Sequence, residues 1–333
     1  MSLRSKIITA AFIGAAFVVG FFAHGLTSPS AEGVGSDNSN VDVRQAGSHG
    51  ESLTNPLLEC AELPESISIA ERKGLENDIR NIITEYQSAG KIVEASVYFR
   101  DLNNGPWFGI EQEKDFYPGS LLKVPLAMSF YWHAEDDPDS LKKTFVYEKG
   151  AQDFDANQPF RHPTPLEDGK EYSVQELIEI MLRESSNEAA LALAQLAGVD
   201  RVMSVYRDFG ITPPQTGADT QLDVHTFASF FRILYNATYL DRTYSEEMLS
   251  VLARSTFREG IPSGVPSNII VAHKFGTREI GGKAVTRQLH DCGIIYAGEN
   301  PYVLCIMTQG SDYAQLTDFI KEISSLVYER ISQ

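Results

Sequence analysis

The chain has 333 residues, 43% of them hydrophobic, and a formal net charge of −17. This length is enough for one large domain or two smaller ones with a sizeable core. Because the acidic residues are scattered and no basic stripe interrupts them, we expect no nucleic acid among the partners of this chain.

The N-terminal residues predict export to the cell envelope. Arg4 and Lys6 precede an apolar run over residues 7–23, which is the pattern of an export signal. The run is short for a membrane span and long for the core of a signal peptide. Residues 1–25 are therefore expected to be either a cleaved signal peptide or a retained membrane anchor. The remainder would be membrane-anchored, or secreted or periplasmic, and would meet the membrane only through an uncleaved N-terminal segment.

Composition separates a linker from a folded domain. Residues 26–56 are rich in Ser, Gly, Asn and Asp, which predicts a flexible linker, and residues 57–333 form the expected domain. The spacing of Cys and His suggests no metal site, and we expect neither metal nor cofactor.

The three cysteines are too few for a disulfide framework. Cys292 and Cys305 lie in apolar, strand-like runs, which favours small buried thiols. A single bridge in an oxidising compartment stays open, and the sequence does not choose its partners among these two and Cys60.

Hydrophobic periodicity gives the order of the secondary structure. The expected elements are, in chain order, a helix over 71–87, strands over 93–101 and 107–111, a mostly helical block over 120–252, strands over 268–276, 289–298 and 301–310, and a helix over 314–331. This order predicts an α/β (α+β) fold in which the two ends of the chain share an antiparallel five-stranded sheet flanked by the terminal helices. An all-helical subdomain is inserted between them, and ligands are favoured where the two layers meet.

A serine and a lysine share one helical face in the stretch YPGSLLKVPLAM, residues 117–128. Ser120 and Lys123 are three residues apart, so that the amine can reach the hydroxyl. A serine becomes a nucleophile when a nearby base takes its proton, and a lysine is such a base only if its charge is destabilised. The bare pattern is weak, because Ser140 and Lys143 repeat it in a polar stretch that we expect at the surface.

Two further motifs follow. Ser185-Ser186-Asn187 joins two helical runs, where the serines would also serve as an N-cap. Lys274-Phe275-Gly276-Thr277 ends a strand-like run. A lysine there can meet an anionic substrate group beside a glycine that permits close backbone approach, or it can be a solvated strand end.

Together these motifs resemble the class A β-lactamase catalytic domain family, the serine penicillin-recognising hydrolases, whose pattern is S-x-x-K, S-x-N and K-[ST]-G. The resemblance covers residues 57–333 and implies a β-lactamase/transpeptidase-like fold. It implies that Ser120 is the acylated nucleophile, that Lys123 is its base, directly or through water, and that Ser185 passes a proton to the leaving nitrogen.

The resemblance also implies how a substrate is bound. Asn187 would bind the amide side chain of the substrate, and Lys274 and Thr277 would hold its carboxylate. Lys274 would also keep Lys123 neutral by repulsion. The backbone N–H groups of Ser120 and Thr277 would form an oxyanion hole, in which one donor is worth about 100- to 1000-fold in rate.

The sequence departs from the family pattern at two places. Phe275 replaces a Ser or Thr, so that a hydroxyl is lost which Thr277 would have to supply. The E-x-x-L-N loop, whose glutamate activates the deacylating water, is missing, and Asp219 and Asp223 are the only carboxylates in residues 210–231. Either could substitute, but we expect Asp223 to begin the next helix. Loss of a general base costs about 100- to 10,000-fold in the step it serves.

These observations predict an exported serine hydrolase that forms an acyl-enzyme on Ser120. Its substrate would be a β-lactam or a D-Ala-D-Ala-type peptidoglycan stem peptide, with either β-lactam hydrolysis or D,D-peptidase activity, in a monomeric domain. The missing glutamate favours the peptidase. The alternative is a weakly catalytic or non-catalytic cell-envelope binding module on the same fold, which Phe275 and the missing base favour and the intact nucleophile and base oppose.

Overall fold

The structure is a computed structural model that describes residues 52–55, 68–103, 105–156, 158–160, 163–211, 220–281 and 285–332. The predicted export segment, residues 1–25, lies outside these ranges, as do Cys60, Asp219 and most of the predicted linker. Within the described ranges, no helix is long and apolar enough to cross a membrane.

Both ends of the chain contribute to one antiparallel sheet of five strands, in the order β2-β1-β9-β8-β7. The strands are β1 (Glu94–Asp101), β2 (Trp107–Ile110), β7 (Ile270–Ile280), β8 (Thr286–Tyr296) and β9 (Tyr302–Gly310). β1 pairs with β9 along its whole length, with Tyr98 opposite Cys305. The predicted five-stranded sheet is therefore confirmed. β9 is buried on both faces, which explains its nearly continuous apolar sequence, and β8 is buried along most of its length although it carries several polar residues.

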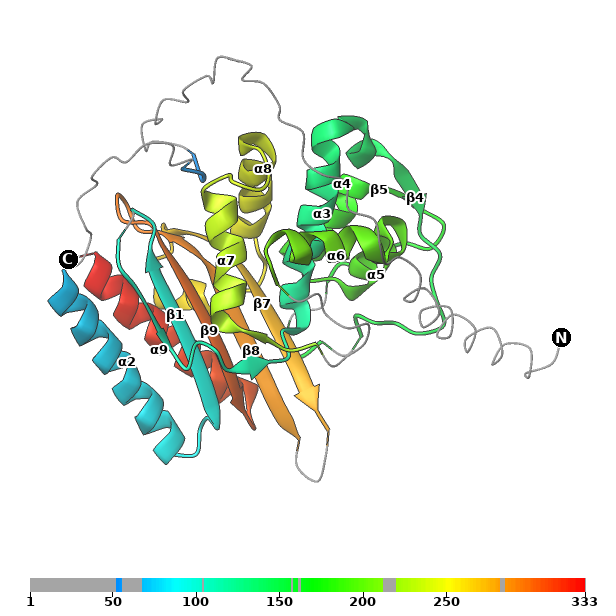
Figure 1. Ribbon diagram of the computed structural model, residues 1–333. Coiled ribbons are helices and arrows are strands. Elements are labelled where there is room, and N and C mark those ends of the chain that lie inside the picture. Colours follow the sequence, from blue (N-terminus) through cyan, green and yellow to red (C-terminus); the bar gives the residue numbers. More distant parts are fainter. Residues whose placement is uncertain are drawn as a thin grey trace, which may run out of the picture. The chain divides into compact units, whose positions relative to one another are not determined.

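The terminal helices α2 (Ile69–Ser88) and α9 (Tyr313–Ile331) cover one face of this sheet (Figure 1). Their apolar side chains recur at helical spacing, with Leu75 and Ile79 on α2 and Ile320 and Ile323 on α9 almost fully buried. These side chains and the facing residues of the sheet form one hydrophobic core.

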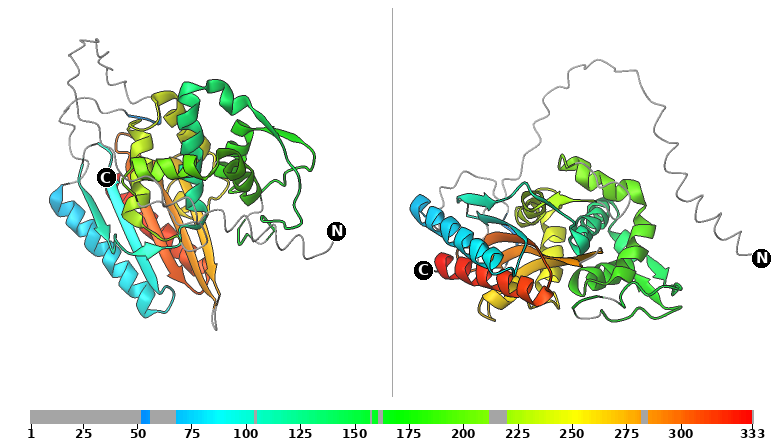
Figure 2. Two further views of the ribbon diagram at one scale, coloured as in Figure 1. Left: turned by 45° about the vertical axis from the view of Figure 1, so that its right-hand side comes forward. Right: turned by 90° about the horizontal axis from the view of Figure 1, so that it is seen from below.

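The other face carries the helical block, which Figure 2 shows from two further sides. Its helices are α3 (Lys123–Asp136), α4 (Val174–Arg183), α5 (Asn187–Ala197), α6 (Val199–Asp208), α7 (Val224–Tyr235) and α8 (Arg242–Ala253), with 3-10 turns η1 (Gly119–Leu122) and η2 (Pro138–Lys142). A third 3-10 turn, η3 (Ile261–Gly264), packs instead against α9. Phe227 and Phe231 of α7 belong to the second core, together with Cys305 and Met307 of β9. The site motifs lie where this block meets the sheet.

The inserted block is not all-helical, and in this respect the prediction was wrong. Two short antiparallel ladders accompany its helices, one between β3 (Asp115–Phe116) and β6 (Leu222–Asp223), the other between β4 (Thr144–Val146) and β5 (Glu171–Ser173). Pro and Gly residues and a high polar content interrupt helical periodicity between β4 and β5, so that this segment runs as loops and turns.

Residues 52–55, from the C-terminal end of the predicted linker, contact the folded domain. The Glu246 carboxylate of α8 accepts hydrogen bonds from the backbone N–H groups of Leu53 at 2.6 Å and Thr54 at 2.9 Å. The Tyr296 hydroxyl donates to the Leu53 carbonyl at 2.8 Å. The described part of the linker is therefore bound to α8 and β8.

Cys292 and Cys305 form a disulfide between β8 and β9. The two residues are direct cross-strand neighbours in the sheet, and both are fully buried. The prediction that they are separate buried thiols was wrong, because the sequence shows two apolar strands without showing the register that places the two sulfurs opposite each other.

Replacing both cysteines with Ala should destabilise the protein. The bridge closes a loop with a sequence separation of 13, for which loop-closure entropy corresponds to about 3 kcal/mol. Urea unfolding of the oxidised protein and of the Cys292→Ala/Cys305→Ala variant measures the difference. Peptide mapping supplies the control, since both residues should be alkylated only after reduction. Alkylation of either residue without reductant would contradict the bridge.

Candidate functional site

Ser120 lies in the 3-10 turn η1, directly before α3, and is half-buried. The turn packs against strand β7 so closely that no side chain fits between them. A Cβ on Gly119, whose φ is +55°, would overlap the Thr277 carbonyl, and a Cβ on Gly276 would overlap the Pro118 carbonyl. The two glycines therefore bring the first and third motifs into backbone contact.

Two side chains of β8 hold the segment that leads to Ser120. The Tyr117 N–H donates to Gln288 Oε1 at 3.0 Å, and His290 Nε2 lies 3.0 Å from the Tyr117 carbonyl. Burial lowers the pKa of His290 to about 4, so its ring is neutral. Its Nδ1 accepts from the Thr308 N–H, and Nε2–H therefore donates to Tyr117. Neither residue was predicted from the sequence, although two polar side chains in alternation within a strand were a signal.

The second motif forms the turn between α4 and α5. Ser185 has a φ of +62°, which is unusual for a residue with a side chain and turns its carbonyl toward α3. Ser186 caps α5, since its hydroxyl accepts from the Ala189 N–H at 3.1 Å. Asn187 begins α5, and its amide Nδ2 donates to the Phe154 carbonyl at 2.9 Å. That bond leaves the Asn187 Oδ1 oxygen facing Lys123.

The Lys123 amine is the centre of the site. Its Nζ lies 3.0 Å from Ser120 Oγ, 2.5 Å from the Ser185 carbonyl and 2.8 Å from Asn187 Oδ1. The residue is 5% exposed. Burial lowers the pKa of Lys123 to about 7, against the smaller opposing effect of the Asp155 carboxylate. A large fraction of the amine is therefore neutral at neutral pH.

The neighbours of Lys123 determine what a neutral amine does there. The Ser185 carbonyl and Asn187 Oδ1 can only accept hydrogen bonds, so they take both N–H groups of the amine. The lone pair is then left for the third neighbour, the Ser120 hydroxyl. This arrangement makes the Ser120 oxygen a proton donor to Lys123, as activation of a serine nucleophile requires.

Lys274 lies on the other side of Ser185 and is fully buried. Its Nζ is 2.9 Å from Ser185 Oγ and 2.9 Å from the Phe275 carbonyl. Burial lowers the pKa of Lys274 well below its usual value, and repulsion from Lys123 lowers it further. Ser185 Oγ is also 3.4 Å from the Lys123 amine, so that its hydroxyl connects the two lysines.

The six predicted site residues are all brought together. Hydrogen bonds through the two lysine amines join five of them: Ser120, Lys123, Ser185, Asn187 and Lys274. The sixth, Thr277, reaches the site through its backbone next to Gly119. Within the described residues, no group of three or more His, Cys, Asp or Glu side chains is arranged to hold a metal ion.

Phe275 occupies an aromatic cluster. Its ring stacks on Phe257 with 4.1 Å between centroids and meets the ring of Phe160 edge-on at 5.9 Å. The Lys274 Nζ lies over the Phe275 ring, 4.3 Å from its centroid. Phe160 comes from the loop between β4 and β5, and the cluster thus ties this loop to the sheet beside the third motif.

Asp223, which we weighed as a substitute for the missing glutamate, is the N-cap of α7. Its Oδ1 accepts from the Thr226 N–H at 2.7 Å and its Oδ2 from the Thr226 hydroxyl at 2.9 Å. The expectation that it begins this helix is confirmed.

A model of the beta-lactamase enzyme family matches residues 73–331, which is most of the chain and all three motifs. The chain belongs to the beta-lactamase enzyme family. No protein with a curated function matches it.

Solved structures confirm the fold and the predicted resemblance to class A enzymes. PBP-A is 18% identical, with a TM-score of 0.65 over 80% of this chain and 98% of that chain. The TLA-3 extended-spectrum beta-lactamase is 17% identical, with a TM-score of 0.69 over 78% and 99%. A class A beta-lactamase from Mycobacterium abscessus is 20% identical, with a TM-score of 0.64 over 77% and 98%. This family member therefore has the β-lactamase and penicillin-binding-protein fold.

Direct titration of Lys123 tests the neutral amine. The ¹³Cε resonance of Lys123, assigned by its loss in Lys123→Ala, should titrate with a midpoint near pH 7, because burial destabilises the charged form. The amine is then mostly protonated below that pH and mostly neutral above it. A midpoint above pH 9 would contradict the proton acceptor described here.

Proposed function

We propose that this chain is an exported serine hydrolase that is acylated on Ser120 by β-lactams or by D-Ala-D-Ala-type peptides. The observation that carries the proposal is the placement of Lys123, whose two N–H groups face carbonyl oxygens while its lone pair faces the Ser120 hydroxyl. A mutant of PBP-A has been solved as an acyl-enzyme complex with penicillin G, which supports the substrate class by analogy.

In the proposed acylation, the Ser120 oxygen attacks the substrate carbonyl while its proton passes to the Lys123 amine. The Oγ–C bond forms, and the carbonyl oxygen becomes an anion that the N–H groups of Ser120 and Thr277 would bind. The C–N bond then breaks. Ser185 gives its hydroxyl proton to the leaving nitrogen and regains one from the Lys123 ammonium, 3.4 Å from its oxygen. The proton that leaves Ser120 is thus balanced by the one gained by the leaving nitrogen, and Lys123 and Ser185 end with their original number of protons.

Substrate binding in this proposal uses the remaining residues. Asn187 is the first residue of α5, and its side-chain amide would bind the amide side chain of the acyl donor. Lys274 and Thr277 would hold the substrate carboxylate, with Phe275 contributing an aromatic face in place of a hydroxyl. The packing of Phe275 against Phe257 supports a less polar carboxylate subsite than the family pattern has.

Slow deacylation is the second part of the proposal. Asp223 is engaged as a helix cap, and its two oxygens are bonded to Thr226. Of the two candidate carboxylates, Asp219 lies outside the described residues and Asp223 does not act as a base that activates water in this proposal. Loss of such a base should slow hydrolysis of the ester by about 100- to 10,000-fold. We therefore favour a penicillin-binding D,D-peptidase over an efficient β-lactamase. The alternative of a binding module with little catalysis is less well supported, because binding requires no neutral lysine beside a serine.

Export remains part of this proposal. The Cys292–Cys305 disulfide supports it, because structural disulfides persist mainly in oxidising compartments outside the cytosol. Attachment to the membrane depends on whether residues 1–25 are cleaved.

Intact-mass measurement with penicillin G tests the proposal. The purified chain should gain the mass of one penicillin and keep it for hours, and Ser120→Ala should gain nothing. Lys123→Ala should slow the gain by about 100- to 10,000-fold, because the general base is lost. A transient adduct with released penicilloate would instead show β-lactamase turnover. Absence of any adduct at millimolar penicillin would overturn acylation by β-lactams.

A further inference from the structure

Asp155 lies in the loop between β4 and β5, outside the three motifs, and its carboxylate is buried. Its Oδ1 accepts from the Asn187 N–H at 2.6 Å and from Gln158 Nε2 at 2.8 Å, and its Oδ2 accepts from the Ser186 hydroxyl at 2.7 Å. Hydrogen bonds to a charged acceptor are about twice as strong as neutral ones. One carboxylate therefore fixes two consecutive residues of the second motif.

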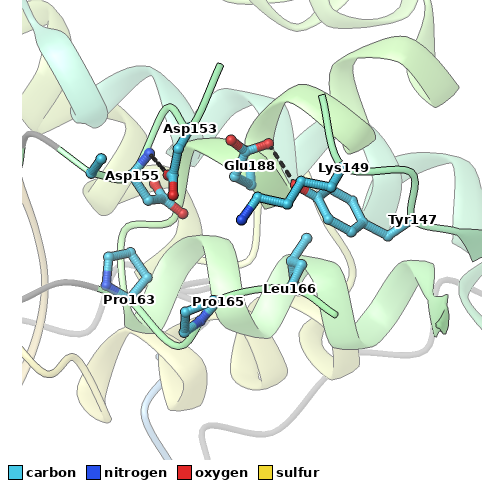
Figure 3. Close-up of a pocket in the computed structure, with 9 residues that line it drawn as sticks. Tyr147, Lys149, Asp153, Asp155, Pro163, Pro165, Leu166 and Glu188 are labelled. Atoms are coloured by element: carbon cyan, nitrogen blue, oxygen red, sulfur yellow. Dashed lines mark hydrogen bonds between the residues drawn. The ribbon is translucent and has the colours of Figure 1, made fainter. Parts of the chain in front are cut away.

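The loop that carries Asp155 is itself held on α5. The Phe154 N–H donates to Glu188 Oε1 at 2.8 Å, and the Phe154 carbonyl accepts from Asn187 Nδ2 at 2.9 Å. Figure 3 shows Asp155 beside Asp153 and Glu188 at a cavity of about 270 Å³, with Asp153 bonded to the Asp155 backbone. These hydrogen bonds hold the backbone around Asp155 in place independently of its own contacts with the second motif.

The turn that Asp155 holds presents both acceptors of the Lys123 amine. Ser185 has a left-handed backbone, which costs of order 1–3 kcal/mol for a residue of this kind and persists only where neighbours enforce it. Asp155 bonds the two residues that follow Ser185. Loss of these bonds would free the turn to relax, and the Ser185 carbonyl and Asn187 Oδ1 would then leave Lys123.

We propose that Asp155 is the positioning residue of the serine–lysine site, acting through the Ser185–Asn187 turn and through its charge on Lys123. The proposal rests on the proposed role of Lys123 as base. Gln158 helps Asp155 to hold the turn, because its Nε2 also lies 3.3 Å from the Ser185 carbonyl. The geometry supports a role for Asp155 in holding this turn and not in proton transfer, since three donors already occupy its two carboxylate oxygens.

The charge of Asp155 also affects the pKa of Lys123. Among the described residues, the titratable groups that interact with Lys123 are Asp155 from the β4–β5 loop and Lys274 from β7, and its other neighbours are hydroxyls, a carbonyl and an amide. Asp155 raises the pKa of Lys123, while burial lowers it. Removing the carboxylate charge should therefore lower the pKa and keep Lys123 neutral to lower pH.

Two substitutions separate geometry from charge. Asp155→Asn keeps an oxygen for the Asn187 and Gln158 donors, and its amide can donate to the Ser186 oxygen, so the turn is held without the charge. Asp155→Ala removes both. Asp153→Asn is the matched control: it removes one charge from the same exposed loop, touches no residue of the second motif and keeps its oxygen for the Asp155 N–H.

The expected results differ for each variant. Asp155→Asn should move the Lys123 ¹³Cε midpoint and the acid limb of penicillin acylation to lower pH by about one unit, with the plateau rate nearly kept. Asp155→Ala should lower the plateau rate by about 100-fold, because small misplacements of reacting groups have that effect. Asp153→Asn should resemble the unmodified protein in both measurements.

An unmoved Lys123 midpoint in Asp155→Asn, or an unchanged plateau rate in Asp155→Ala, overturns the proposal. If Asp155→Ala does not fold, the Asp155→Asn titration decides alone. The titration needs no substrate. A protein that forms no penicillin adduct therefore refutes the proposed function, while the shift of the Lys123 midpoint still tests the role of Asp155.

Discussion

The burial of two lysine amines around one serine is the constraint on which the site depends. The side chains of Lys123 and Lys274 are almost fully buried, and both amines lie within hydrogen-bond distance of the same Ser185 hydroxyl. Two ammonium ions in such a position would repel each other without water to screen them. The fold must therefore keep at least one amine neutral, and a neutral amine beside a hydroxyl is a base. In the proposed function, the ability of Lys123 to accept a proton therefore follows from the cost of burying charge.

The fold supplies this burial by bringing together residues that are far apart in sequence. Pairing of β1 with β9 fixes the sheet from which β7 presents Lys274, and α3 carries Lys123 out of the helical block. Gly119 and Gly276 let the two layers meet backbone to backbone. A side chain at either glycine would separate the lysines and admit water. The same amines would then be ordinary ammonium ions, without the ability to accept a proton from Ser120.

Periodicity predicted the sheet and the terminal helices. The order of the three motifs and their resemblance to a known family predicted that six residues share a site, and the structure brings these residues together. The sequence did not predict the contacts that depend on register or on loop paths. The Cys292–Cys305 bridge requires β8 and β9 to pair with those residues opposite each other. The support of Tyr117 by Gln288 and His290 requires the same sheet. Asp155 lies in a loop without periodicity, and nothing near it in sequence points to Asn187.

Asp155 also explains how the second motif can carry Ser186 at its centre. A turn that holds an unfavourable backbone at Ser185 needs an acceptor for the N–H groups and hydroxyls that the turn exposes. A short hydroxyl cannot supply that acceptor by itself, since Ser186 Oγ is already occupied with the cap of α5. The carboxylate arrives from another part of the chain and accepts from Ser186 and Asn187 together. In this chain, the anion that holds the turn therefore comes from the β4–β5 loop and not from the motif itself.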